Sequence, residues 1–79
     1  MKIELKLYAS LASHMRKRTS ENSWSVEISE GTRIRELLEH LKIPTNDVKV
    51  VFLNGVHAGG DEILNDGDRV GVFPPIGGG

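Results

Sequence analysis

The chain has 79 residues and no cysteine, and ten basic residues against eleven acidic ones give it a net charge of −1. Its length supports one compact domain and is too short for two. The lack of cysteine excludes disulfides, thiolate metal sites and a cysteine nucleophile, and the balanced charge offers no field for holding DNA or another polyanion. We therefore expect one domain, built on one core, that binds no nucleic acid.

The first eight residues alternate in polarity. Ile3, Leu5 and Leu7 are separated by polar or amphipathic residues, which predicts a half-buried strand over 2–8. This stretch lacks the unbroken apolar segment of a secretory signal. The longest aliphatic and aromatic run, 50–53, is far shorter than the roughly 20 residues that a bilayer crossing needs. We expect a cytoplasmic protein with no membrane contact.

The next segment predicts a short helix and a second strand. Ser10 can cap a helix whose apolar positions, Leu11 and Met15, stand four residues apart. The basic run 16–18 would complement the negative end of that helix. Apolar residues then alternate with Ser and Glu over 23–29, which predicts a strand that pairs with the first as a loose hairpin.

The clearest helix follows, with Thr32 as its expected N-cap. Its apolar residues recur at helical spacing and form one stripe: Ile34, Leu37, Leu38 and Leu41. Pro44 cannot continue a helix, so this one is expected to end near Lys42. Arg33 and Arg35 in the first turn oppose the helix dipole slightly, and we interpret them as neutral surface residues.

The remaining predicted elements are a strand over 48–53, a tight turn at 54–55, a return strand over 56–58, a turn over 64–68 and a strand over 69–73. Asn54 and Gly55 are typical of a type I′ hairpin, which needs two positive φ angles. Gly67 can take a left-handed conformation in its turn.

This order of elements indicates the α+β class, with a mixed sheet of about five strands packed on one main helix. A ubiquitin-like β-grasp fits it best, with a domain over 1–73 and a flexible, reactive C-terminal tail over 74–79. In that fold the first and last strands are parallel neighbours, which brings Tyr8 and Phe73 together. By alternation both face away from the helix, and we expect Val51 beside them. These residues form either a docking patch at the root of the tail or merely scattered surface apolars.

The tail has the composition of a reactive end. Pro74 and Pro75 favour a stiff polyproline segment, and six residues can extend about 20 Å. The three glycines, 77–79, lack a Cβ and could pass through a narrow channel, with the carboxylate of Gly79 arriving first. A carboxylate must be activated by ATP before it reacts, yet the chain has no phosphate-binding motif. It would therefore bind no cofactor and be the substrate of an enzyme that uses ATP. A frayed, inert end is the alternative.

The ending LNDGDRVGVFPPIGGG resembles the C-terminal signature of MoaD/ThiS-type sulfur carriers, especially the small subunit of molybdopterin synthase, and IELKLYASLA resembles their first strand. The resemblance implies that a ubiquitin-activating-type adenylyltransferase adenylates the carboxylate of Gly79, which then becomes a thiocarboxylate. It also implies that Gly77 and Gly78 thread the partner's channel. The residues that would pack at its mouth are Phe73, Pro74, Pro75 and Ile76.

The resemblance further implies a role in molybdenum cofactor biosynthesis, with the molybdopterin synthase large subunit as partner. The Phe-Pro-Pro sequence favours this pathway, whereas the short stretch IPTNDVKVVFLNG is closer to the carriers of the thiazole pathway. Sulfur delivery for thiamine thiazole or tRNA thiolation, a ubiquitin-like protein modifier, and an inert β-grasp interaction module stay open. In none of these readings is the chain an enzyme by itself.

Other candidate sites have weaker support. His14, His40 and His57 show no two-ligand spacing, so we expect no metal site. Asp66 and Asp68 flank Gly67 but lack the spacing of a calcium loop. We interpret them as turn residues.

Overall fold

The computed structural model describes residues 1–8, 11 and 23–75. Its elements are β1 (Lys2–Leu7), β2 (Ser23–Glu27), α1 (Ile34–His40), the short 3-10 helix η2 (Thr45–Asp47), β3 (Val50–Leu53), β4 (Val56–Ala58) and β5 (Arg69–Phe73). The expected helix over Ser10, Leu11 and Met15 lies outside the described residues except for Leu11, which is buried. The basic run 16–18, His14 and the tail residues 76–79 also lie outside them.

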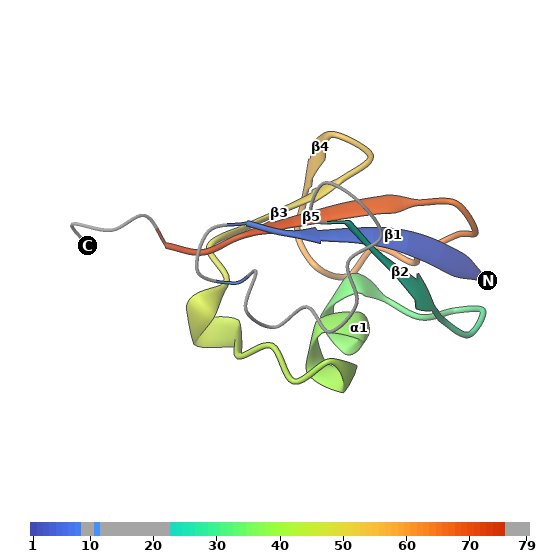
Figure 1. Cartoon of the computed structure of the whole chain (residues 1–79), viewed down its shortest axis with the longest axis horizontal. Coiled ribbons are helices and arrows are strands. Elements are labelled where there is room, and N and C mark those ends of the chain that lie inside the picture. Colours follow the sequence, from blue (N-terminus) through green and yellow to red (C-terminus); the bar gives the residue numbers. More distant parts are fainter. Residues whose placement is uncertain (9–10, 12–22, 76–79) are drawn as a thin grey trace.

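The strands form a mixed sheet in the order β2-β1-β5-β3-β4, with α1 packed on one face (Figure 1). β1 and β5 are parallel, whereas the pairs β1/β2, β3/β5 and β3/β4 are antiparallel. The predicted β-grasp is thereby confirmed, including the contact between the first and last strands. All the strands predicted in the described part are present.

The predicted turn conformations are also confirmed. Asn54 and Gly55 have φ angles of 52° and 84°, as a type I′ hairpin between β3 and β4 requires. Gly67 has a φ of 86°, and its N–H donates to the carbonyl of Lys2 at 2.7 Å. Both turns therefore have the backbone conformation that their connections between strands require.

The start of α1 differs from the prediction. Arg33 is the N-cap, with extended backbone angles, and its N–H donates to Oε1 of Glu36 at 2.9 Å. The hydroxyl of Thr32 instead donates to the carbonyl of Ser29 at 2.8 Å. Thr32 as N-cap is wrong because its hydroxyl closes the preceding turn and is not available to the helix.

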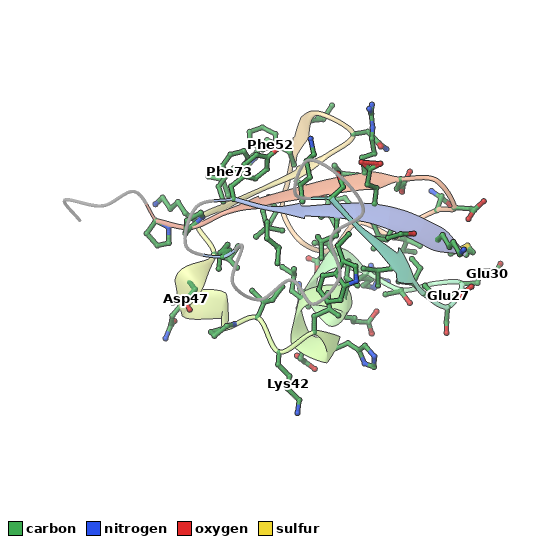
Figure 2. All side chains as sticks on the ribbon, in the orientation of Figure 1. Glu27, Glu30, Lys42, Asp47, Phe52 and Phe73 are labelled. Carbon is green, nitrogen blue, oxygen red and sulfur yellow. The ribbon has the colours of Figure 1, made fainter. Side chains whose placement is uncertain are left out.

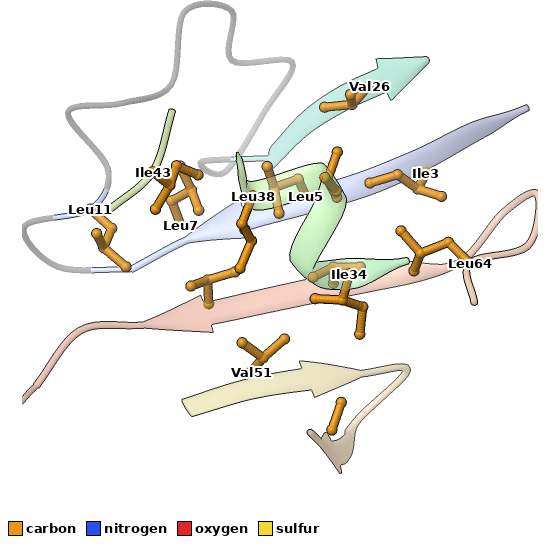
Figure 3. Close-up of a cluster of buried hydrophobic side chains, with 14 residues drawn as sticks. Ile3, Leu5, Leu7, Leu11, Val26, Ile34, Leu38, Ile43, Val51 and Leu64 are labelled. Carbon is orange, nitrogen blue, oxygen red and sulfur yellow. The ribbon is translucent and has the colours of Figure 1, made fainter. Parts of the chain in front are cut away.

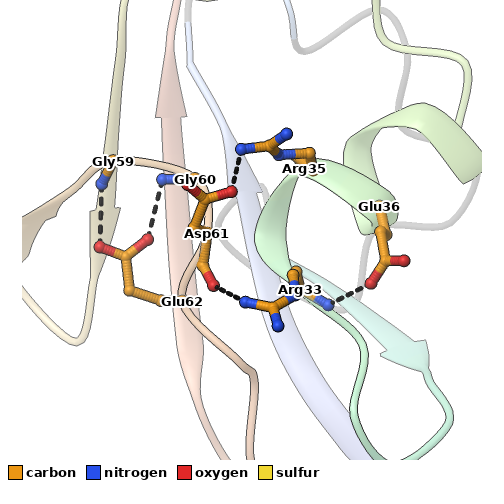
Figure 4. A network of polar contacts seen from close by, with 7 residues as sticks. All are labelled: Arg33, Arg35, Glu36, Gly59, Gly60, Asp61 and Glu62. Atoms are coloured by element: carbon orange, nitrogen blue, oxygen red, sulfur yellow. Dashed lines mark hydrogen bonds and ion pairs between the residues drawn. The ribbon is translucent and has the colours of Figure 1, made fainter.

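A loop over 59–64 lies against the first turn of α1 (Figure 4) and supplies acceptors for its backbone N–H groups. The N–H groups of Ile34 and Arg35 donate to the carbonyls of Glu62 and Gly60, at 3.1 and 2.9 Å. Tertiary contact thus satisfies helix donors that usually rely on a side-chain cap.

The two arginines of this turn also hold the loop. The guanidinium of Arg33 donates to the carbonyl of Asp61 at 2.7 Å, and Arg35 forms an ion pair with the Asp61 carboxylate. These arginines are therefore loop anchors, and their interpretation as neutral surface residues is wrong. That role could not be predicted because the loop lies more than twenty residues away in the chain.

The C-terminal end of α1 forms a Schellman motif, in which the helix closes through a left-handed residue. Lys42 has a φ of 61° and donates its N–H to the carbonyl of Glu39 at 3.0 Å. The N–H of Ile43 donates to the carbonyl of Leu38 at 2.9 Å. The helix therefore stops at His40, two residues before the predicted end.

A single core fills the space between α1 and the sheet (Figure 3). The predicted inward residues of β1 and the stripe of α1 are all part of it, except that Leu41 is only partly buried at its margin. The buried members are Ile3, Leu5, Leu7, Leu11, Val26, Ile34, Leu37, Leu38, Ile43, Val51, Ala58, Leu64, Val70 and Val72. The core leaves the opposite face of the sheet open.

Candidate functional site

Four rings form a row across the open face of the sheet, which we call the aromatic row: Tyr8, Phe73, Phe52 and His57. Tyr8 stacks on Phe73 with ring centroids 4.1 Å apart and planes 5° apart. Phe73 meets Phe52 edge to face at 5.7 Å, and Phe52 meets His57 at 6.0 Å. Figure 2 shows Phe52 and Phe73 on the side of the sheet opposite α1. Rings in these geometries attract one another and form a stiff platform.

The register of β1 and β5 explains why two of these rings point outward. Leu7 pairs with Val72 in the parallel ladder, and both side chains belong to the core. Since side chains alternate along a strand, the next residues, Tyr8 and Phe73, face the other way. The predicted placement of Tyr8 and Phe73 is confirmed.

Val51 does not lie beside them. Its side chain is only 7% exposed and packs in the core, because β3 pairs Val51 with Val72. Phe52, which pairs with Gly71, takes the outward position instead. The predicted placement of Val51 beside the rings, on which its partner-binding role depended, is therefore wrong, and the next residue, Phe52, occupies that place. The alternation along β3 was predicted correctly, but not which of its two faces is outward.

Gly71 forms the floor of a groove beside the rings. A Cβ on Gly71 would lie 3.4 Å from Cε2 of Tyr8 and 3.9 Å from Cε1 of Phe73, so the rings lean over a strand without a side chain at this point. The side chains around the groove come from three strands and their ends: Glu4, Lys6, Tyr8, Phe52, Arg69 and Phe73. The groove could not be predicted from the sequence, because a single glycine within a strand gives no local signal of a groove.

The end of β5 is held on both sides. The N–H of Lys49 donates to the carbonyl of Phe73 at 2.8 Å, and the N–H of Tyr8 donates to the carbonyl of Val72 at 3.1 Å. Pro74 and Pro75 have no N–H and cannot extend the ladder. The chain therefore leaves the sheet from a defined point next to the aromatic row. Pro75 is the last described residue, so the predicted roles of Ile76, Gly77, Gly78 and Gly79 stay predictions.

The turn over 64–68 aligns three strands. Oδ1 of Asp66 accepts from the N–H of Lys2 at 2.8 Å. The Asp68 carboxylate accepts from Nδ2 of Asn54 at 3.0 Å and from the N–H of Asn65 at 2.8 Å. Both carboxylates have backbone or amide donors, which agrees with the prediction of a turn rather than a calcium loop. The sequence did not reveal that they join this turn to the β3–β4 hairpin.

Of the two histidines in the described residues, His40 is exposed on α1 and His57 lies in β4. Within 1–8, 11 and 23–75, no three His, Cys, Asp or Glu side chains are grouped to hold a metal ion. Over the same residues, no helix has the length and apolar character needed to cross a bilayer.

A five-stranded sheet on one helix, with its first and last strands side by side, defines a ubiquitin-like β-grasp protein. Comparison with protein families gives a match to the ThiS family over residues 11–79, and the chain belongs to this family. Its members are small sulfur carrier proteins and are not catalysts themselves.

Solved structures agree with this assignment. The assigned molybdopterin converting factor subunit 1 of Pyrococcus furiosus is 29% identical, with a TM-score of 0.70 over 95% of this chain and 98% of that one. SAMP1 of Haloferax volcanii is 22% identical, with a TM-score of 0.73 over 100% of both chains. A complex of subunits 1 and 2 of the Helicobacter pylori molybdopterin-converting factor gives 20%, 0.63 and 100% of both chains.

The matches at 20% and 22% identity demonstrate the shared fold. No functionally curated protein matches the chain. The chain thus combines the ThiS family assignment with a ubiquitin-like fold that it shares with these proteins.

Proposed function

We propose that this protein carries sulfur in the cytoplasm for molybdenum cofactor biosynthesis, as the small subunit of a molybdopterin synthase. Its reactive group is the carboxylate of Gly79. A ubiquitin-activating-type adenylyltransferase consumes ATP to activate this carboxylate, which becomes a thiocarboxylate. The large subunit of the synthase then receives the sulfur.

The chemistry takes place at one carbon atom. A carboxylate oxygen of Gly79 attacks the α-phosphorus of ATP and pyrophosphate leaves, which produces an acyl adenylate. A sulfide-level donor then attacks the acyl carbon, and the C–O bond to AMP breaks. The product retains the acyl carbon with sulfur in place of one oxygen. Activation is needed because a free carboxylate has no good leaving group.

The observation that carries the proposal is the ThiS family match, which continues through the tail to Gly79. Two further facts support the pathway: the 29% identity to the Pyrococcus protein assigned as a molybdopterin converting factor subunit, and the Phe-Pro-Pro sequence after β5. The Helicobacter complex supports the idea of a second subunit as partner.

The geometry suggests how the folded domain and the tail would each contribute to binding the partner. The aromatic row provides a docking platform at the root of the tail. Pro74, Pro75 and Ile76 would pack at the mouth of the partner's channel, and Gly77 and Gly78 would thread it. Ordering each glycine costs on the order of 1–2 kcal/mol, so contacts made by the platform must offset the ordering of the tail.

Intact mass spectrometry tests the activation step. We expect co-expression with the adenylyltransferase and a sulfur donor to produce a species in which sulfur replaces one oxygen at Gly79. The purified thiocarboxylate, mixed with the large subunit and cyclic pyranopterin monophosphate, should then form molybdopterin. Failure of this second reaction, with the first intact, would redirect the proposal to thiazole synthesis or tRNA thiolation.

A protein modifier is the second candidate function. The observation that supports it is the fold shared with SAMP1, the small archaeal modifier protein 1 of Haloferax volcanii. It predicts adducts in which Gly79 is joined to lysine side chains of other proteins, visible by peptide mass spectrometry. A chain that forms neither an adenylate nor an adduct would be an interaction module.

A further inference from the structure

The tip of the β3–β4 hairpin carries the one Asn-Gly pair in the sequence, Asn54-Gly55. Both residues are exposed. Glycine has no side chain to shield its backbone nitrogen, and a Cβ built on Gly55 would meet no heavy atom within 4 Å beyond its chain neighbours. The pair therefore has the composition and the solvent access that let a backbone nitrogen attack the preceding side-chain amide, a reaction through which asparagine is thermally labile.

Both ends of the Asn54 amide are bound by the segment that leads into β5. Oδ1 accepts from the N–H of Arg69 at 2.9 Å, and Nδ2 donates to Oδ1 of Asp68 at 3.0 Å. Only one orientation of the amide gives both of its ends a partner, because an N–H only donates and a carboxylate only accepts. The departure of Nδ2 as a leaving group therefore requires that its bond to Asp68 be broken first.

The backbone of the turn opposes the same reaction. Asn54 has a φ of 52°, as the first central residue of a type I′ turn requires. A ring that joins Cγ of Asn54 to the N of Gly55 fixes the backbone between the two residues in a conformation that this turn does not have. Ring closure therefore needs a local opening of the hairpin tip, of the kind that folded proteins undergo without unfolding globally.

We propose that Asn54 is a site of spontaneous modification, at which the side-chain amide is lost when the contact with Asp68 and Arg69 opens. The N of Gly55 gives its proton to hydroxide and attacks Cγ of Asn54. The Cγ–Nδ2 bond breaks, and Nδ2 takes up a proton and leaves as ammonia. One water molecule then opens the resulting succinimide. Opening at Cγ leaves aspartate, whereas opening at the main-chain carbonyl leaves isoaspartate, with one extra carbon in the backbone.

Either product weakens the attachment of the hairpin to the start of β5. Aspartate at position 54 places a second carboxylate where Nδ2 now lies 3.0 Å from Oδ1 of Asp68, and like charges this close repel each other. Isoaspartate lengthens a two-residue turn whose length sets the register between β3 and β4. Because neither product reverts to asparagine, modified chains accumulate with age and are less stable than new ones.

Incubation of the purified full chain at mildly alkaline pH, followed by peptide mass spectrometry, tests the proposal. We expect the peptide that contains Asn54 to gain the mass difference between an amide and an acid, and an isoaspartate-specific methyltransferase to label it. Asp68→Ala should raise the rate by about tenfold, because the amide then loses one of its two partners. The matched control, Ile34→Val, lowers stability in the core without touching Asn54 and should keep the wild-type rate.

A second comparison does not depend on the folding of any variant. The unfolded reference is a synthetic peptide with the sequence of residues 52–56, FLNGV. The folded wild type should react at least about tenfold more slowly than this peptide, because both hydrogen bonds of the amide protect it.

The effect on stability has its own pair of variants. Asn54→Asp, which makes one of the two products, should lower the urea midpoint. The double variant Asn54→Asp/Asp68→Asn should regain much of the loss. In that variant the new amide at 68 donates to the new carboxylate at 54, and its oxygen accepts from the N–H of Asn65, as the Asp68 carboxylate does now.

The proposal is overturned if the folded wild type reacts as fast as the peptide, or if Asp68→Ala reacts no faster than Ile34→Val. It is also overturned if isoaspartate forms at Asp66-Gly67, a second pair able to close such a ring, while Asn54 stays intact. A double variant no more stable than Asn54→Asp would contradict the assigned contact.

Discussion

Two adjacent residues of β3 separate packing in the core from the proposed docking platform. Val51 is buried in the core, and Phe52 belongs to the aromatic row. We predict that Val51→Asn lowers the free energy of unfolding by about 3 kcal/mol, because it buries an amide without a partner. Phe52→Asn should cost only about 1 kcal/mol, since its amide can reach water.

Urea denaturation measures these two costs. Steady-state kinetics of ATP–pyrophosphate exchange, catalysed by the adenylating enzyme, measure how well each variant binds that enzyme. Phe52→Asn should raise the KM for the adenylating enzyme even though the protein stays folded. The assignment of faces would be contradicted if Phe52→Asn were the more destabilising of the two variants.

Glu62 makes stability depend on pH in the acid range. The N–H groups of Gly59 and Gly60 donate to its carboxylate at 2.9 and 2.8 Å, and these bonds, the one from Gly59 first, lower the pKa of Glu62. A lowered pKa in the folded state means that the carboxylate contributes its full stability above the pKa of an unfolded glutamate. This contribution is lost as the pH falls through the lower pKa of the folded state.

The measurement is the urea midpoint as a function of pH for the wild type and for Glu62→Gln. We expect the variant to be less stable near neutral pH and the two proteins to converge in acid. Glu39→Gln, on the exposed side of α1, is the control and should follow the wild type throughout. A constant gap between wild type and Glu62→Gln at all pH values would contradict the assigned role.

At the scale of elements, the C-terminal end of α1 contains one residue with a strained backbone conformation, and a substitution there should stabilise the fold. Lys42 adopts a left-handed φ of 61°, where a side chain costs roughly 1–2 kcal/mol. Lys42→Gly should therefore raise the free energy of unfolding by about 1 kcal/mol, part of the gain being lost to the flexibility of glycine in the unfolded chain. Lys42→Ala keeps the Cβ and should give no gain. Equal effects of the two variants in urea denaturation would exclude this explanation.

The hydrogen-bonded contact between the 64–68 turn and the β3–β4 hairpin, which we call the joint, depends on Asp68. Its carboxylate accepts from Asn54 and from the N–H of Asn65. We expect Asp68→Ala to lower the free energy of unfolding by about 1–3 kcal/mol, because both donors lose their partner. Asp47→Ala, at an exposed position of η2 (Figure 2), removes the same charge and serves as the control. A loss no larger than that of Asp47→Ala would show that the joint is unimportant.

At the scale of the whole molecule, folding and reactivity are assigned to different parts. The core lies within the described residues, whereas the proposed reactive carboxylate belongs to Gly79. Adding one alanine after Gly79 should abolish adenylation, because the carboxylate would no longer reach the α-phosphorus of ATP. The thermal midpoint should not change. Mass spectrometry and thermal denaturation measure the two properties.

The control is a longer extension that a specific protease removes after Gly79. Activity should return upon cleavage, which would show that the protein was competent throughout. A fully active extended protein would contradict the assignment of Gly79 as the reacting residue.

Much of the fold was predictable because its signals are local. The alternation in β1, the helical stripe of α1 and the Asn54-Gly55 turn each depend on a few neighbouring residues and on backbone geometry. The proximity of Tyr8 and Phe73 was predictable as well, since a β-grasp brings the ends of the first and last strands together. The reactivity of the tail was inferred from its ending and stays a prediction, since residues 76–79 lie outside the described residues.

Most of the misses share one physical cause, which is that they depend on segments distant in the chain. Alternation shows that Val51 and Phe52 face opposite ways, but only the pairing of Val51 with Val72 selects the buried one. The role of Arg33 and Arg35 could not be understood without the loop over 59–64. Thr32 was lost as the cap for a local reason, because its hydroxyl bonds to the carbonyl of Ser29. The groove over Gly71 exists because three strands meet there. Local periodicity specifies the elements of this protein, while strand register and loop contacts determine which side chains the surface presents.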